Sequence, residues 1–412
     1  MSVTTEHQDG FNATLEASLE RLQQALRQAL IQAGVQKPGP TAISRSLGLD
    51  KSIAWKIGRI AKAEQPLQAL EFLPGPQGAR IVVDAFVAAK IPKLVHQELH
   101  DAFGALERDI EHHAGDRITA KAMARAAMSS SAQPSLDENL RREHFRTASS
   151  IWGAQARVQL KADFIAPGTA PLTIDTVGFE GFIDLRRLRP GVPWRIGRKR
   201  VINESGVQET TFQPLDPRCD GDLPLFHDHC STPLPGLSSH EDNEGFHNFT
   251  LEPGRVGRTG SVNCLIATKC ASVIDLNGGD KTNGLFTGVH QRTPSELLVL
   301  DLFVHRSLAP IETPEAGLHG QLVMGPASPV GGLDAPLPVP FNIENLSTRP
   351  GGQSLLEVPD YSDAIQDTMR MAGDAFGHER WKLEDFIGYR VRLTYPPIPT
   401  IGWIRIQLPT DF

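Results

Sequence analysis

The N-terminal third of the chain alternates apolar and polar residues with the period of an α-helix. In the segment LEASLERLQQALRQALIQAG, leucine recurs every three or four positions from Leu15 to Leu30, which places these side chains on one face of an amphipathic helix. Gly34 and the KPGP that follows are expected to end this helix. The same spacing predicts further helices over 79–89, 94–112, 118–128 and 136–151.

The pattern changes after residue 152, where apolar segments alternate with clusters of Pro, Gly, Asn and Asp. Segments such as ARVQLKADFI (156–165) and ELLVLDLFVH (296–305) are typical of β-strands. Helix is expected again only near the end, over about 361–376, with 379–386 as a second candidate. We therefore expect an α+β multidomain chain, in which an N-terminal all-α domain precedes a large, mainly antiparallel β domain, built as a sandwich or a barrel.

Residues 42–61, AISRSLGLDKSIAWKIGRIA, predict two short helices joined by a tight turn. Ile43 and Leu47 would face inward from the first helix, and Gly48 suits a turn position with positive φ. Asp50 or Ser52 can cap the second helix. The outward face of that second helix would then carry Lys51, Ser52, Trp55, Lys56 and Arg59.

This pattern resembles the helix-turn-helix superfamily of bacterial transcription regulators over about residues 19–63. The resemblance implies that the second helix lies in the major groove of double-stranded DNA. Trp55 departs from the usual small polar residue, and would either touch the sugar-phosphate or pack on a neighbouring helix. The alternative is an ordinary helical hairpin used for protein contacts. The expected DNA contacts are Arg45, Lys51, Ser52, Trp55, Lys56, Arg59 and Lys62.

The local excess of positive charge around this helix pair favours DNA binding. Six cations between Lys37 and Lys62 face a single acid, Asp50, whereas the whole chain carries a formal net charge of −7. A uniformly basic coat for nucleic acid is therefore excluded, but a basic module on an acidic body is not.

Composition and turn residues divide the chain of 412 residues into more than one domain. We expect a flexible N-terminus, a helix-turn-helix domain, a helical extension, a Ser-rich linker and a β-rich C-terminal domain. The respective ranges are 1–14, 15–66, 67–128, 129–135 and 136–412.

A second basic run, RRLRPGVPWRIGRKR, spans residues 186–200 with seven cations and no acid. Pro190 and Gly191 predict the tip of a β-hairpin. The run could bind an anion or form a second nucleic-acid contact; the alternative is a solvated hairpin or a surface that pairs with a partner's acids. Its cations are Arg186, Arg187, Arg189, Arg195, Arg198, Lys199 and Arg200.

The segment CDGDLPLFHDHC brings together Cys219, His227, His229 and Cys230. Thiolate and imidazole are the ligands that zinc prefers, so these four residues are the candidate metal site. Their spacing is not that of a zinc finger, and the surrounding Pro and Asp predict a loop.

The leading hypothesis is a cytoplasmic DNA-binding transcription regulator that acts as a dimer, with a β-rich domain that senses a small-molecule effector or mediates assembly. The first alternative is a non-enzymatic interaction or assembly protein of a bacterial or phage system. The second is a metal-dependent enzyme that uses the Cys219–Cys230 cluster, with zinc as the candidate metal. Since no motif points to a specific reaction, we expect a protein without catalytic activity. The sequence also predicts neither a signal peptide nor a membrane-spanning segment.

Overall fold

The computed structural model describes residues 3–127, 134–169, 173–191, 193–199, 213–219, 221, 223–243, 247–275, 284–310, 312–320, 337, 339, 341–346 and 361–409. The chain divides into two compact units, Met1–Ala132 and Gln133–Phe412, which we call the helical unit and the β-rich unit. The division falls inside the predicted linker, 129–135. The predicted order, helices first and then a mainly antiparallel β region, is confirmed.

The helical unit is built around one apolar core. Prolines occupy the first turn of α2, α4 and α5, where a missing N–H costs nothing. Buried side chains from Leu15 to Ala124 form a single cluster, so residues 15–66 and 67–128 share one core. The helices are α1 (Val3–Gln32), α2 (Pro40–Leu47), α3 (Lys51–Lys62), α4 (Pro66–Ala69), α5 (Pro76–Ala88), α6 (Lys93–Ala114) and α7 (Arg117–Ala127), with a 3₁₀ turn, η1, at Leu70–Phe72.

Helix α1 begins at Val3, so residues 3–14, expected to form a flexible N-terminus, lie within the same helix as the leucine stripe. The sequence has no proline before Pro38, and the helix therefore continues toward the N-terminus from Leu15 without a proline to interrupt it.

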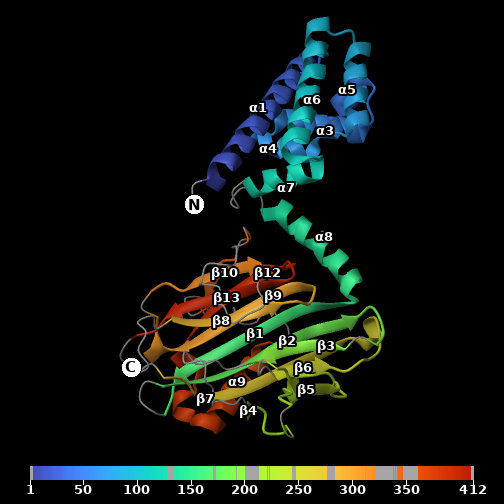
Figure 1. Cartoon of the computed structure of the whole chain (residues 1–412). Coiled ribbons are helices and arrows are strands. Elements are labelled where there is room, and N and C mark those ends of the chain that lie inside the picture. The colour runs from blue at the N-terminus through green and yellow to red at the C-terminus, as the bar shows by residue number, and fades with distance from the viewer. Residues whose placement is uncertain are drawn as a thin grey trace. The chain divides into compact units, whose positions relative to one another are not determined.

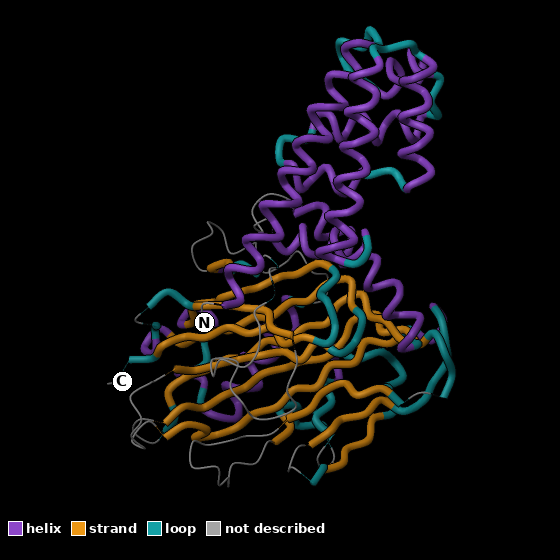
Figure 2. The backbone as a smooth tube through the Cα atoms, turned by 45° about the horizontal axis from the view of Figure 1, so that its top comes forward, coloured by secondary structure: helices purple, strands orange, loops and turns teal. Residues whose placement is uncertain are grey.

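A seven-stranded sheet forms the centre of the β-rich unit (Figures 1 and 2). Its strand order is β11-β12-β9-β1-β2-β7-β4, with β1 and β9 parallel and every other neighbouring pair antiparallel. These strands are β1 (Ala154–Pro167), β2 (Thr173–Arg187), β4 (Gln213–Pro214), β7 (Val262–Asp275), β9 (Ser295–His305), β11 (Ile343–Asn345) and β12 (Phe386–Thr394).

The two faces of this sheet carry different layers. Alternate residues along a strand point to opposite faces, and Val299 and Phe303 pack with α9 (Ser362–Phe376) while Leu298 and Leu300 pack with the sheet β10-β13-β8. A second small sheet, β3-β6-β5, covers β2 and β7 on that latter face. The strands of these two three-stranded sheets are β3 (Trp194–Lys199), β5 (Leu237–Glu241), β6 (His247–Leu251), β8 (Gly284–Gln291), β10 (Glu315–Gly320) and β13 (Thr400–Gln407).

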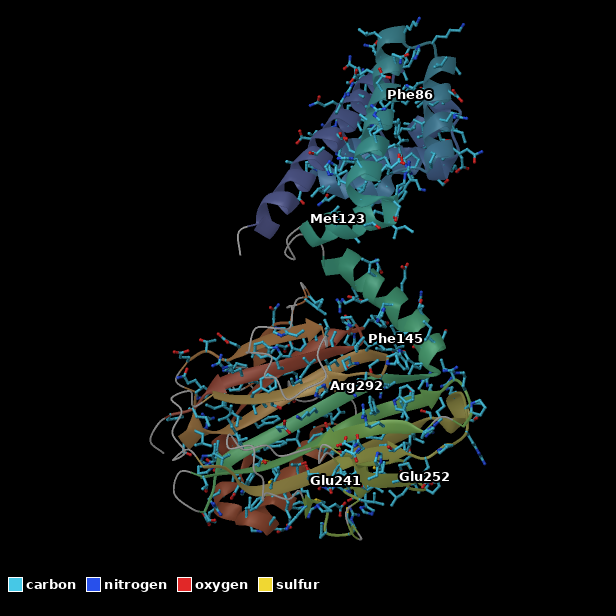
Figure 3. The ribbon with its side chains drawn as sticks, in the orientation of Figure 1. Phe86, Met123, Phe145, Glu241, Glu252 and Arg292 are labelled. Atoms are coloured by element: carbon cyan, nitrogen blue, oxygen red, sulfur yellow. The ribbon has the colours of Figure 1, made fainter. Side chains whose placement is uncertain are left out.

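Helix α8 (Pro134–Trp152) belongs to the β-rich unit and leads into β1. The ring of Phe145 lies 5.5 Å from that of Tyr395, centroid to centroid, and the guanidinium of Arg142 lies over the same Tyr395 ring. Figure 3 labels Phe145 near the C-terminal end of α8. These contacts hold the middle of α8 against Tyr395, the residue that follows β12.

Candidate nucleic-acid interface

Helices α2 and α3 are joined by the tight turn Gly48–Asp50. Gly48 has φ +66 and ends α2 in the left-handed region, which glycine adopts without a steric penalty. Ser44 Oγ donates to the Leu49 carbonyl at 2.7 Å. Asp50 caps α3 by accepting from the Ser52 amide at 2.7 Å, and its hydrogen bonds with Ser52 hold the pKa of this carboxyl below its usual value. The turn is therefore fixed from both sides.

The inner face of this pair is buried against α1. Gln23 Nε2 donates to the carbonyls of Ile60 and Ala63 at 3.0 and 3.1 Å, and Arg27 Nε donates to that of Ala61 at 2.7 Å. These side chains satisfy carbonyls that the end of a helix otherwise leaves open. Helix α1 therefore covers the inner face of α3, while Lys51, Ser52 and Lys62 on its other side are exposed.

The outer face carries the predicted cations. Arg45, Lys51 and Lys62 are exposed, as is Ser52, and Lys56 is half-buried. Within the described side chains of this unit, none of these four cations pairs with a carboxylate. The helix pair therefore presents positive charge that the unit itself does not neutralise.

Two of the residues predicted to contact DNA, Trp55 and Arg59, pack against Phe72 within the helical unit. Trp55 meets Phe72 edge to face, with ring centroids 5.4 Å apart, and the guanidinium carbon of Arg59 lies 4.7 Å from the centroid of the same ring. Such contacts are worth about 0.5–1.5 kcal/mol each. Trp55 thus packs on the neighbouring segment, although its side chain stays 47% exposed.

The second basic run does not form one cationic surface. Arg187 is buried and donates to the carbonyls of Leu251 and Glu252. The hairpin prediction is wrong, because β2 and β3 belong to different sheets and β3 pairs with β6. Pro190 and Gly191 lie where the chain crosses between the two sheets. Arg186 pairs with Asp184, Arg189 donates to the Ile151 carbonyl, and Arg195 donates to the Asn248 side chain. The side chains of the other three cations lie outside the described residues; these are Arg198, Lys199 and Arg200.

The two histidines of the candidate metal site point to different partners. His227 Nδ1 lies 3.1 Å from Asp216 Oδ2, and His229 Nε2 lies 2.9 Å from Asp367 Oδ2 on α9. Among the described residues, no group of three or more His, Cys, Asp and Glu side chains is placed to hold a metal ion. Proximity in sequence does not make a ligand set here, because the 3₁₀ turn at His227–His229 spreads the two rings.

The two thiols are likewise engaged elsewhere. Cys219 Sγ bonds the Leu225 carbonyl at 3.1 Å, and Cys230 Sγ bonds the Leu265 carbonyl at 3.3 Å. Burial, with the nearby Asp216 carboxylate, raises the pKa of Cys219 to about 11, so this thiol stays protonated at neutral pH. The predicted zinc site is therefore not supported by the geometry.

The β-rich unit holds a buried ionic group that was not predicted from the sequence. Asp301 on β9 accepts two hydrogen bonds from Arg390 on β12, at 2.8 and 2.6 Å, and one from the Tyr361 hydroxyl at 2.8 Å. All three residues are at most 2% exposed. Asp301 is the one acid inside the apolar run LLVLDLFV (297–304), and a charged residue among apolar neighbours is the sequence signal for a buried partner.

Comparisons with known proteins do not assign the chain to a family. No family model matches it, and no curated protein matches it. Among solved structures, it is similar to a candidate protease from Parabacteroides distasonis ATCC 8503, with 7% identity and a TM-score of 0.30. That alignment covers 63% of this chain and 41% of the other, so this chain spans less than half the length of that protein.

Proposed function

We propose that this protein binds double-stranded DNA through α3 of the helical unit and acts as a transcription regulator. The observation that carries the proposal is the outer face of α2 and α3, two helices joined by a tight turn, where exposed cations pair with no carboxylate among the described side chains. Lys and Arg at such positions meet phosphates and guanine edges, and Ser52 can meet either. In this proposal the β-rich unit senses an effector or mediates assembly.

The roles within α3 are unequal. Lys51 and Ser52 stand at the N-terminal end of α3, the end that contacts bases in helix-turn-helix proteins. Arg45 and Lys62 would contact the phosphate backbone. Trp55 and Arg59 are partly occupied by Phe72, so their role is to hold η1 against α3 and to border the contact surface. One such module buries a modest area, which favours a dimer on two half-sites.

Membrane association forms no part of the proposal. In the described part of the chain, every helix falls short of the length and apolar character needed to cross a bilayer.

Charge removal on α3 tests the proposal. We expect the variant Lys51→Gln/Lys62→Gln to bind labelled genomic duplex more weakly than the wild type, because each lysine that leaves a phosphate removes one counterion-release contribution. The slope of log K against log salt concentration should become shallower by about 2. Fluorescence anisotropy of the full-length chain over a salt series measures both quantities.

The matched control is Lys93→Gln/Arg108→Gln, which removes two exposed cations from α6. The proposal requires this control to keep the wild-type affinity and slope. Equal losses in both variants would mean that binding follows net charge alone, and an absence of duplex binding by the wild type at low salt would refute DNA binding.

A further inference from the structure

Four exposed apolar residues stand on three segments whose backbones meet at one corner of the β-rich unit. Ile151 and Trp152 end α8, Leu188 follows β2, and Val256 lies in the segment after β6. Their exposed fractions are 64%, 53%, 43% and 41%. Scattered single apolar residues are normal on a protein surface, but a cluster of this kind marks an interaction site. We call these four residues the α8 corner.

Backbone hydrogen bonds hold the α8 corner together. The Leu188 amide donates to the Gly153 carbonyl at 2.8 Å, and the Gly257 amide donates to the Arg187 carbonyl at 2.7 Å. Arg189 Nη2 also donates to the Ile151 carbonyl at 2.7 Å. Three segments far apart in sequence are thereby fixed side by side where α8 meets β1 (Figure 1). A surface that is ordered before binding loses little conformational entropy on binding.

The rim of the α8 corner is positively charged. Arg189, Arg255 and Arg258 are exposed, and within the described side chains none of them pairs with a carboxylate. Glu252, which Figure 3 labels just beyond the end of β6, is the exposed acid in the same segment. Three arginines against one glutamate give this corner a sign opposite to that of the chain as a whole, which is −7.

We infer that the α8 corner docks an acidic segment of a partner protein that carries apolar side chains. Tryptophan and arginine are the residues that most often dominate binding energy at protein interfaces, and the arginine rim selects for carboxylates. A symmetric dimer through this corner would bring like charges together, which disfavours a second copy of the chain. Ile151, Leu188 and Val256 present aliphatic surface that neither stacks on bases nor bonds phosphates, which disfavours nucleic acid.

This inference goes beyond DNA binding and does not depend on it. The test uses the full-length chain and three labelled ten-residue peptides: one with a central Leu-Phe pair among Asp and Glu, one with Lys in place of the acids, and one with Ser in place of Leu and Phe. We expect only the first to bind. The variants Trp152→Ala and Arg255→Glu should each weaken this binding about tenfold, as measured by anisotropy.

The matched control is Leu234→Ala/Lys382→Glu, which alters an exposed leucine and an exposed lysine elsewhere on the same unit. Its affinity for the acidic peptide should equal that of the wild type. The inference fails if the acidic peptide does not bind at millimolar concentration, or if the corner variants bind it as well as the control does. It also fails if vesicles with one quarter phosphatidylserine occupy the corner and the peptide does not displace them.

Discussion

Replacing Asp301 with asparagine is expected to lower the free energy of unfolding by about 3–5 kcal/mol, because the charge of Arg390 is then left buried without its counterion. The carboxylate accepts both Arg390 hydrogen bonds and that of the Tyr361 hydroxyl. Burial and the Asp301 charge raise the pKa of Tyr361, so its hydroxyl stays protonated and depends on the same acceptor. Urea unfolding followed by circular dichroism measures the loss.

Strand β12 offers a matched control for this prediction. Arg392, two residues along, pairs with Glu344 at 2.8 Å, but both side chains are about one third exposed. Glu344→Gln should therefore cost only about 0–1 kcal/mol. If the two variants lose equal stability, the Asp301–Arg390 pair does not support the fold in the way described here.

Replacing Asp216 with asparagine is expected to cost about 2–3 kcal/mol, since hydrogen bonds to a charged acceptor are the stronger ones. Asp216 is buried and accepts from the backbone and guanidinium of Arg218 and from the amide and ring of His227. Asp228 bonds the same arginine at the surface, so Asp228→Asn is the control and should cost about 1 kcal/mol or less.

The Asp216 contribution also has a defined pH dependence. Burial opposes ionisation of this carboxyl, but the Arg218 and His227 hydrogen bonds outweigh it and hold its pKa well below the usual value. A carboxyl with a depressed folded-state pKa stabilises the fold above its unfolded pKa, about 3.9, and loses that contribution as the pH falls. The stability difference between the wild type and Asp216→Asn should therefore shrink below about pH 4. A difference that is constant from pH 7 to pH 3 would contradict this reasoning.

Local patterns predicted much of the helical unit. The leucine stripe from Leu15 to Leu30 is buried along α1, and Gly48 occupies the left-handed position that the turn requires. Both depend only on neighbours within a few residues, which a periodicity can capture. The start of α1 at Val3 was not predicted, because the leucine stripe itself begins only at Leu15.

Long-range partners could not be predicted in the same way. Asp301 and Arg390 are 89 positions apart, and only the pairing of β9 with β12 brings them opposite each other. The basic run near residue 190 was misinterpreted for a related reason. A charge count does not reveal that Arg187 turns inward to the Leu251 carbonyl, 64 positions away. Cys219, His227, His229 and Cys230 are close in sequence, yet each of the four side chains bonds a different group.

Lysine footprinting by acetylation and mass spectrometry tests the central claim, that α3 faces DNA, most directly. The full-length chain is acetylated with and without an excess of genomic duplex at low salt. The account predicts that Lys51 and Lys62, both exposed in the free protein, are modified severalfold more slowly in the presence of duplex, while Lys93 on α6 and Lys382 in the β-rich unit are unaffected. Unchanged rates at Lys51 and Lys62 in a sample that binds duplex would contradict it.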